Sequence, residues 1–134
     1  MCSWHQQIDQ RQGYTLLELM IVVAIAGILI TLAVPSFQRA AVKAREAALK
    51  QNLFTLRSVI DQYYADTGEY PKSLESLVKA GYLRAIPLDP FTKSADTWQL
   101  IFEAEPEEGE IPGIFDVHSG SDLIALNGTP YNEW

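Results

Sequence analysis

Glu18 is the residue whose position most clearly suggests chemistry. Its carboxylate stands near the start of the apolar stretch from Gly13 to Phe37, "GYTLLELMIVVAIAGILITLAVPSF". A carboxylate inside a membrane segment costs about a few kcal/mol on insertion scales, so such residues are usually functional and have a partner. The alternative is that Glu18 only marks the membrane interface, where an acid near the end of a span costs little. Composition alone leaves both interpretations open.

Other reactive side chains are few and scattered. His118 stands alone on a predicted strand, and a lone histidine is more often structural than catalytic. The acids between the two predicted strands resemble a metal cluster, but alternating acids in a loop are usually a solvated surface; they are Glu103, Glu105, Glu107, Glu108 and Glu110. The sequence has no nucleophile with its base, no glycine-rich phosphate loop and no zinc spacing. We therefore expect no enzyme activity.

The charge of the chain argues against nucleic acid as a partner. Its 17 acidic and 10 basic residues give a net charge of −7 and a pI near 4.7. A nucleic-acid surface needs a basic face, whereas this balance repels phosphates.

The apolar stretch itself predicts a membrane span. Tyr14 to Val34 supplies the roughly 20 residues that a helix needs to cross a bilayer, and all of its faces are apolar. A secretory signal peptide would have a basic start, a shorter apolar core and a small-residue cleavage site. Here only Arg11 is basic before the run, and Val34-Pro35-Ser36 is a poor cleavage site.

The rest of the chain predicts an α+β unit. Pro35 predicts a kink or partial melting near Val34. Beyond it an amphipathic helix is expected to continue to about Ala65 and to stop at Gly68. Its apolar stripe is predicted as Phe37, Ala41, Ala44, Ala48, Leu53, Leu56, Ile60 and Tyr63. About 70 residues then remain, too few for a large independent core, so they must pack on this stripe.

Three further features are expected after Gly68. A short helix in "PKSLESLVKAGYL" should be capped by Ser73 and end at Gly81. "DTWQLIFEA" and "GIFDVHS" are predicted strands, joined by the acidic "EAEPEEGEIPG" as a solvated hairpin loop, and "DLIAL" is a weaker third strand. A long helix on a small antiparallel sheet accounts for all of them.

The N-terminal pattern closely resembles type IV pilins and type II secretion pseudopilins. In these families a polar leader ends in Gly, a membrane-embedded prepilin peptidase cuts after it, and the same enzyme N-methylates the new first residue. An acid stands five residues into the mature chain, and a Pro follows further along. The matching residues here are Gly13, Tyr14, Glu18 and Pro35, although the usual first residue is Phe. The resemblance implies a leader at 1–13, a transmembrane and filament-core helix at 14–35, and a periplasmic domain at 36–134.

The resemblance also supplies a partner for Glu18. Cleavage would leave a cationic amine on Tyr14, and filament packing would otherwise bury that amine alone. An unpaired buried charge is costly, and a nearby opposite charge favours both ionised forms. Glu18 of the same or a neighbouring subunit can pair with it and set axial register. The discarded leader would take Cys2 and His5 with it, so neither is expected to be a ligand or a nucleophile.

The second half narrows the resemblance to the major pseudopilins of type II secretion. The resemblance is carried by "TGEYPKSLESLVKAGYL", "PLDPF", "FDVHSGSD" and the final Trp. Phe91-Thr92-Lys93 departs from the pattern that is usual in the family. The family implies a type IV pilin-like fold and a structural Ca²⁺ site in the loop after the sheet. Here the resemblance points to Asp122 and Asn127, with carbonyls from Ser119 or Ser121. The alternative is an ordinary Ser-Gly-Ser-Asp turn.

The function implied is a structural subunit of a periplasmic pseudopilus that helps export folded proteins across the outer membrane. Expected partners are further copies, prepilin peptidase, minor pseudopilins and an inner-membrane assembly platform. One alternative is a type IV pilin or minor pilin for motility, adhesion or DNA uptake, and another is a membrane-anchored binding module or enzyme. The expected location is the inner membrane with a cytoplasmic N-terminus. Arg39, Lys43 and Arg45 after the span oppose that orientation by the positive-inside rule.

Overall fold

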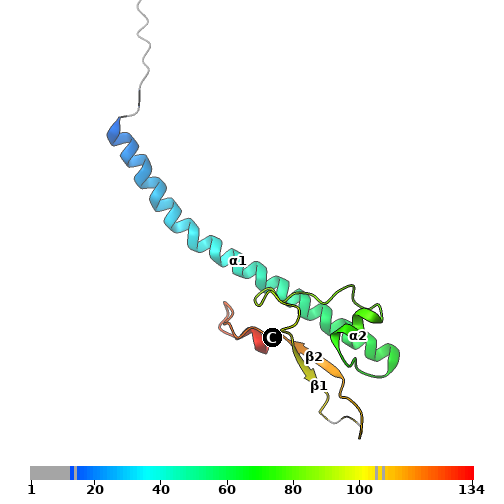
Figure 1. Ribbon diagram of the computed structural model, residues 1–134. Helices are drawn as coiled ribbons and strands as arrows, with labels where there is room; N and C mark the ends of the chain where they lie inside the picture. Colours follow the sequence, from blue (N-terminus) through cyan, green and yellow to red (C-terminus); the bar gives the residue numbers. More distant parts are fainter. Residues whose placement is uncertain (1–12, 14, 105, 107) are drawn as a thin grey trace, which may run out of the picture. The chain divides into compact units, whose positions relative to one another are not determined.

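The computed structural model describes residues 13, 15–104, 106 and 108–134. The predicted leader residues 1–12, Tyr14, Glu105 and Glu107 lie outside this set. The chain divides into two units, one ending at Gln38 and the other running from Arg39 to Trp134. The elements are α1 (Leu16–Thr67), α2 (Leu74–Lys79), β1 (Gln99–Phe102), β2 (Ile114–His118) and a 3₁₀ turn, η1 (Tyr131–Glu133) (Figure 1).

Helix α1 has clear start and stop signals. The backbone N–H of Glu18 donates to Thr15 Oγ1 at 3.1 Å, as expected for an N-cap threonine with an acid three residues later. At the other end Gly68 has φ +77°, and its N–H donates to the Tyr64 carbonyl at 2.8 Å. Only glycine adopts this backbone conformation freely. The predicted stop at Gly68 is confirmed.

Of the two outcomes predicted at Pro35, a kink or partial melting, the melting is wrong. Pro35 lies inside α1, which is helical without interruption from Leu16 to Thr67. A proline removes a single backbone N–H from the ladder. The apolar residues on both sides keep helical geometry, so the loss of that one bond does not end the helix.

The first unit carries the apolar part of α1. By length and composition this helix could cross a membrane. In its most apolar 18-residue stretch, no residue is buried by the described part of the chain. Its large side chains, among them Leu19, Ile28 and Leu32, are about half exposed or more. A helix that is apolar all round and uncovered is typical of a membrane span.

The core of the second unit forms on one face of α1. Leu49, Leu53, Leu56 and Ile60 are buried, at spacings of four, three and four residues, and Tyr63 packs against them. The predicted stripe is therefore right from Leu53 onward and wrong before it. Phe37, Ala41, Ala44 and Ala48 are exposed, because the rest of the unit covers α1 only from about Leu49.

Helix α2 is bounded as predicted. Ser73 Oγ accepts the Ser76 N–H at 3.2 Å, and Gly81 follows the helix with φ +86°. Leu74 and Leu77 are buried on the inner face.

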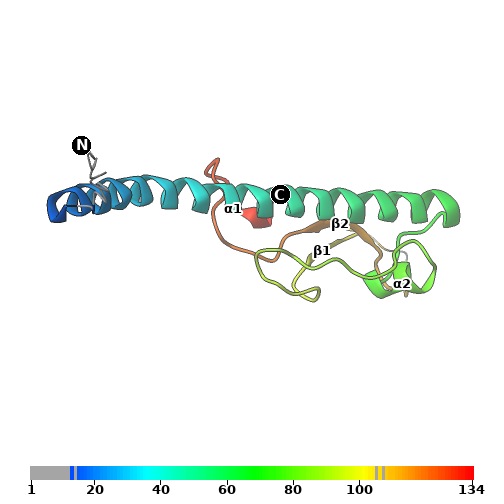
Figure 2. The same ribbon diagram turned by 90° about the horizontal axis from the view of Figure 1, so that it is seen from above.

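Strands β1 and β2 form an antiparallel pair. Gln99 faces His118 and Leu100 faces Val117, and an irregularity follows Ile101. Figures 1 and 2 both show this sheet beside the part of α1 that belongs to the second unit, with α2 near the C-terminal end of the helix. Ile114 and Val117 are fully buried and join the core. The predicted α+β fold, a long helix on a small antiparallel sheet, is confirmed.

The predicted third strand at residues 122–126 is wrong. Ile124 makes only an isolated bridge to Pro130. The Ala125 N–H donates to the Thr129 carbonyl at 2.8 Å, and the Leu123 carbonyl accepts the Tyr131 N–H at 3.0 Å. These backbone groups bond within a tight turn rather than with a neighbouring strand.

Candidate functional site

The predicted processing site lies just before α1. Gly13 is exposed, and a Cβ added to it would meet nothing within 4 Å. Tyr14, which would carry the new amine, lies outside the described residues. The fold of the described chain therefore places no demand on Gly13, and any requirement for glycine here comes from a partner that recognises it.

Glu18 occupies the first turn of α1 and is exposed in the single chain. It is the one charged residue of α1 before Arg39. Its backbone N–H completes the cap with Thr15, and an acid in the first turn is favoured by the helix dipole. The cap uses only the backbone of Glu18, so the helix dipole is the one local effect on its carboxylate, beside the pairing role that the resemblance implies.

The predicted calcium residues fit a metal only in part. The carboxylate of Asp122 is exposed. Asn127 Oδ1 already accepts hydrogen bonds from the N–H and hydroxyl of Thr129. Ser119 and Ser121 are buried, and their hydroxyls accept the N–H groups of Ser121 and Leu123, so only their carbonyls are available to an ion.

Calcium favours several carboxylates. Within the described part of the chain, no three His, Cys, Asp or Glu side chains gather as a metal site. Asp122 is therefore the single strong ligand that this loop offers.

Asp89 is the main buried charge of the second unit, and the sequence analysis did not predict it. Its carboxylate is fully buried and accepts from Ser119 Oγ at 2.5 Å, from the Gly120 N–H at 3.2 Å and from the Phe91 N–H at 2.9 Å. A Cβ at Gly120 would collide with the Thr97 carbonyl oxygen, so glycine is required at this close approach. Asp89 ties the loop before β1 to the end of β2.

The C-terminal segment is held on α1 by charged side chains. Glu46 Oε1 accepts the Leu126 N–H at 2.9 Å and the Tyr131 hydroxyl at 2.8 Å. Arg57 pairs with Asp116 at 2.8 Å and donates to the backbone oxygens of Val117 and Trp134.

Burial, followed by the hydrogen bond to Glu46, raises the pKa of Tyr131 to about 12. The tyrosine therefore stays protonated as a donor. The pKa of Tyr131 in the folded chain lies above its usual value near 10. The hydrogen bond to Glu46 therefore contributes its full stability at neutral pH, and that contribution is lost only above about pH 10.

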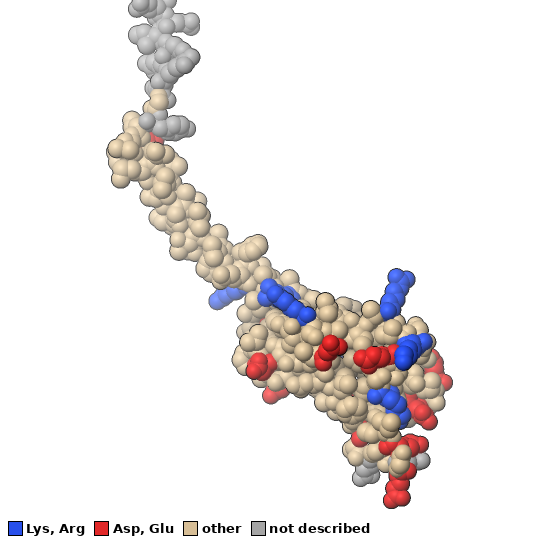
Figure 3. Space-filling view, in the orientation of Figure 1, with Lys and Arg blue, Asp and Glu red and all other residues tan. Residues whose placement is uncertain are grey.

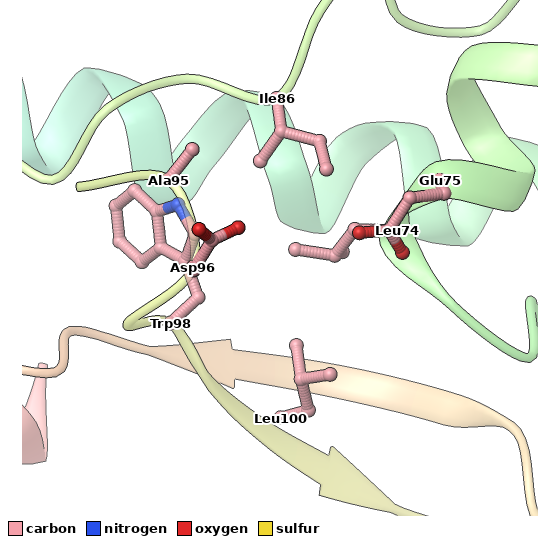
Figure 4. Close-up of a pocket in the computed structure, with 7 residues that line it drawn as sticks. All are labelled: Leu74, Glu75, Ile86, Ala95, Asp96, Trp98 and Leu100. Carbon is pink, nitrogen blue, oxygen red and sulfur yellow. The ribbon is translucent and has the colours of Figure 1, made fainter.

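A small hollow lies between α2, β1 and the loop before it. It has a volume of about 110 Å³ and is lined by Leu74, Glu75, Ile86, Ala95, Asp96, Trp98 and Leu100 (Figure 4). Trp98 Nε1 donates to the Pro87 carbonyl at 2.8 Å. The lining contains no serine, cysteine or histidine, so it offers no nucleophile with its base.

His118, on β2, faces Asp116 rather than this hollow, with 3.6 Å between Nε2 and Oδ2. Its surroundings in the described part of the chain are an ion-pair network with Arg57, which is a structural arrangement.

Comparison with known proteins agrees with the architecture. Residues 8–34 match a family described as a prokaryotic N-terminal methylation motif. The chain is 32% identical to type II secretion system core protein G of Klebsiella pneumoniae over 143 aligned positions, covering 95% of this chain and 96% of that protein. The chain belongs to the type II secretion core protein G family.

Other members of the family give the same result over shorter spans. The protein from Escherichia coli K12 is 33% identical, covering 62% of this chain and 68% of its own length. The protein from Pseudomonas aeruginosa PAO1 is 34% identical, covering 63% of this chain and 71% of its own length. No solved structure gives a significant match. As a core protein G, the chain has the role of a major pseudopilin, and its apolar helix fits a membrane-anchored subunit.

Proposed function

We propose that this pseudopilin is cut between Gly13 and Tyr14 by a prepilin peptidase, N-methylated on Tyr14 and polymerised into a periplasmic pseudopilus. Before assembly the subunit lies in the inner membrane with its N-terminus in the cytoplasm and its second unit in the periplasm. Growth of the filament on an inner-membrane platform, with minor pseudopilins, helps move folded proteins across the outer membrane. The observation that carries this proposal is the match to core protein G over nearly the whole chain, beginning with a methylation motif.

The subunit contributes packing and charge rather than catalysis. In the filament, apolar helices bury their uncovered faces against one another, and Glu18 neutralises the amine of Tyr14 in its own or a neighbouring chain. A use in motility, adhesion or DNA uptake is the competing function. Secretion genes beside this gene would support the pseudopilus, and motility genes would support the alternative.

Replacing Gly13 by leucine should block processing and leave the precursor in the membrane. The reason is that Gly13 has open space around it in the described chain, so leucine disturbs recognition by the peptidase and not the fold. Immunoblotting of membranes, or the mass of the purified chain, measures the ratio of precursor to mature protein.

Gly27→Leu is the matched control for this experiment. Gly27 is also surrounded by open space but lies inside α1, so its substitution should leave cleavage unchanged. Normal maturation of Gly13→Leu would contradict the proposed processing site.

We further infer a weak structural calcium site in the loop after β2. Asp122 would supply its carboxylate, and Ser119 and Ser121 their carbonyls. Asn127 would supply its side-chain oxygen in exchange for its hydrogen bonds to Thr129. One carboxylate among neutral oxygens suits the range of about 10⁻⁴–10⁻³ M found in extracellular modules.

Calcium should raise the melting temperature of the wild type and not that of Asp122→Ala. A tenfold excess over Kd stabilises the folded state by about 1.4 kcal/mol, equivalent to roughly 5–10 °C for a unit of this size. Thermal unfolding followed by circular dichroism, with calcium or with a chelator, measures the difference. If the wild type melts at the same temperature in both, Asp122 is a turn residue and this site does not exist.

A further inference from the structure

An exposed apolar cluster lies on the loop that follows β2. Leu123, Ile124 and Leu126 are 56%, 60% and 50% exposed, while Ala125 between them is buried. We call these three residues the apolar loop. Single exposed leucines are ordinary on protein surfaces, whereas three large apolar side chains within four residues form a patch that needs a partner.

The backbone of the apolar loop is held in place. The Ala125 N–H bonds to the Thr129 carbonyl and the Tyr131 N–H to the Leu123 carbonyl. The Leu126 N–H donates to Glu46 of α1. The three side chains are therefore presented outward by a fixed turn, which lowers the ordering cost of any contact they make.

Three cations precede Glu46, the residue of α1 that holds the apolar loop. Arg39, Lys43 and Arg45 are exposed and lie within seven residues of Glu46, or about 10 Å along a helix. Both ribbon views place the loop beside this early part of the second unit's helix. In the space-filling view, blue side chains lie over the same part of α1, and the red ones are most crowded toward the β1–β2 connection (Figure 3).

The sequence position of these cations identifies the partner. Val34 is the last residue of the apolar run, and Arg39 follows five residues later, about 7.5 Å at helical rise. The headgroup layer on each side of the hydrocarbon core is roughly 5–7 Å thick. In a chain anchored by this run, the backbone of Arg39 therefore lies at the outer edge of the phospholipid headgroups. Lys43 and Arg45 follow at about 13.5 and 16.5 Å from Val34, and their long side chains can extend back toward the lipid phosphates.

We propose that the apolar loop and the Arg39–Arg45 segment form a docking surface for an anionic phospholipid bilayer. Leu123, Ile124 and Leu126 enter the boundary between headgroups and acyl chains, and the three cations contact lipid phosphates. Apolar burial combined with attraction to anionic lipid is the general basis of interfacial binding. The proposal rests on the membrane anchorage given under the proposed function.

This docking also accounts for the unusual charge pattern of the chain. Three basic residues after the span oppose the expected orientation, unless they have a local use on that side. Lipid phosphates provide that use, and each cation near an anionic surface raises occupancy about fivefold. Two acids adjoin the apolar loop: Asp122 precedes it in the sequence, and Glu46 accepts the Leu126 N–H. Three cations against these two carboxylates leave a net charge of about +1 on the surface.

The test uses the full chain with Cys2 replaced by serine, reconstituted into liposomes that contain phosphatidylglycerol. A polarity-sensitive fluorophore is attached to Ile124→Cys, or to Ile111→Cys as the control. Ile111 is 69% exposed but lies on the β1–β2 connection, where the neighbouring cation is Lys72 and none of the three of the proposed surface. Quenching by lipids that carry a spin label near the headgroup reports contact with the bilayer.

We expect strong quenching at position 124 and little at 111. Neutral lipid, or the triple variant Arg39→Gln, Lys43→Gln, Arg45→Gln, should reduce the quenching at 124 several-fold, because the electrostatic attraction is lost. High salt should act in the same direction.

Three results would overturn the proposal. The first is equal, weak quenching at both positions in a chain that resists alkaline extraction. Resistance to extraction would show that the anchor is intact, and the weak quenching would exclude docking of the loop. Energy transfer between labelled copies at position 124, without lipid quenching, would assign the apolar loop to an interface between subunits. Release of the chain by alkaline extraction would disprove the anchorage and the docking with it.

Discussion

Glu18→Gln should insert into the membrane and be cleaved normally, yet fail to assemble into filaments. In the lone inserted subunit the change is neutral or slightly favourable, because an acid is costly there. In the filament it leaves the Tyr14 amine buried without a counter-ion, and removing one partner of a buried pair typically costs about 3–5 kcal/mol. Electron microscopy of sheared filaments and a secretion assay measure the result.

The start of α1 provides a control that separates charge from helix capping. Glutamine at position 18 keeps the size of glutamate and is tolerated at the third position of a capping box. Thr15→Ala instead removes the oxygen that accepts the Glu18 N–H and keeps the carboxylate, at a cost of about 1 kcal/mol in helix stability. We expect Thr15→Ala to assemble and Glu18→Gln not to assemble.

A mixture of Glu18→Gln and wild-type subunits extends the same experiment. Glu18→Gln subunits present with wild type should interfere, since one unpaired amine disturbs a repeating register. Normal filaments built from Glu18→Gln alone would show that the carboxylate only marks the membrane interface.

Asp89→Ala should have the largest effect on the stability of the second unit. The substitution removes a fully buried carboxylate and leaves the Ser119 hydroxyl and the N–H groups of Gly120 and Phe91 without their acceptor. Buried groups left unsatisfied cost about 1–3 kcal/mol each, partly offset by water, so we expect a loss of about 3 kcal/mol. Thermal unfolding of a fragment that begins at Ser36 should show a melting temperature lower by roughly 10–20 °C.

Asp122→Ala, measured with chelator, is the matched control. Asp122 is exposed, and surface substitutions usually change stability by no more than about 0.5 kcal/mol. Equal melting temperatures for Asp89→Ala and the wild-type fragment would show that Asp89 does not hold the two loops together.

Local signals explain the part of the fold that the sequence predicts well. The apolar run, the Ser73 cap and the turns at Gly68 and Gly81 each depend on neighbouring residues, so the end of α1 and both bounds of α2 follow from the printed letters. The two strands follow from their β-branched and aromatic residues. The leader and Tyr14 are likewise read from a contiguous motif, which only an experiment on the protein can test.

Long-range contacts explain what the sequence did not predict. Asp89 stands in an Asp-Pro pair that is typical of a turn, but its partners Ser119 and Gly120 lie about 30 residues away. Arg57 and Glu46 look like solvent-facing helix residues, and only the fold brings Asp116 and Tyr131 to them. The residues at 122–126 have strand character, yet their hydrogen bonds go to the turn at Thr129. Tertiary partners decided each of these cases.

The intact mass of the protein purified from its native membranes tests the central claim most directly. The account predicts a single species that begins at Tyr14 and is heavier by one CH2, because a methyl group replaces a hydrogen on the N-terminal amine, where fragmentation places it. A mature chain that retains residues 1–13, or one cut at another position, would contradict the account, because the pairing of Glu18 requires a free amine at Tyr14.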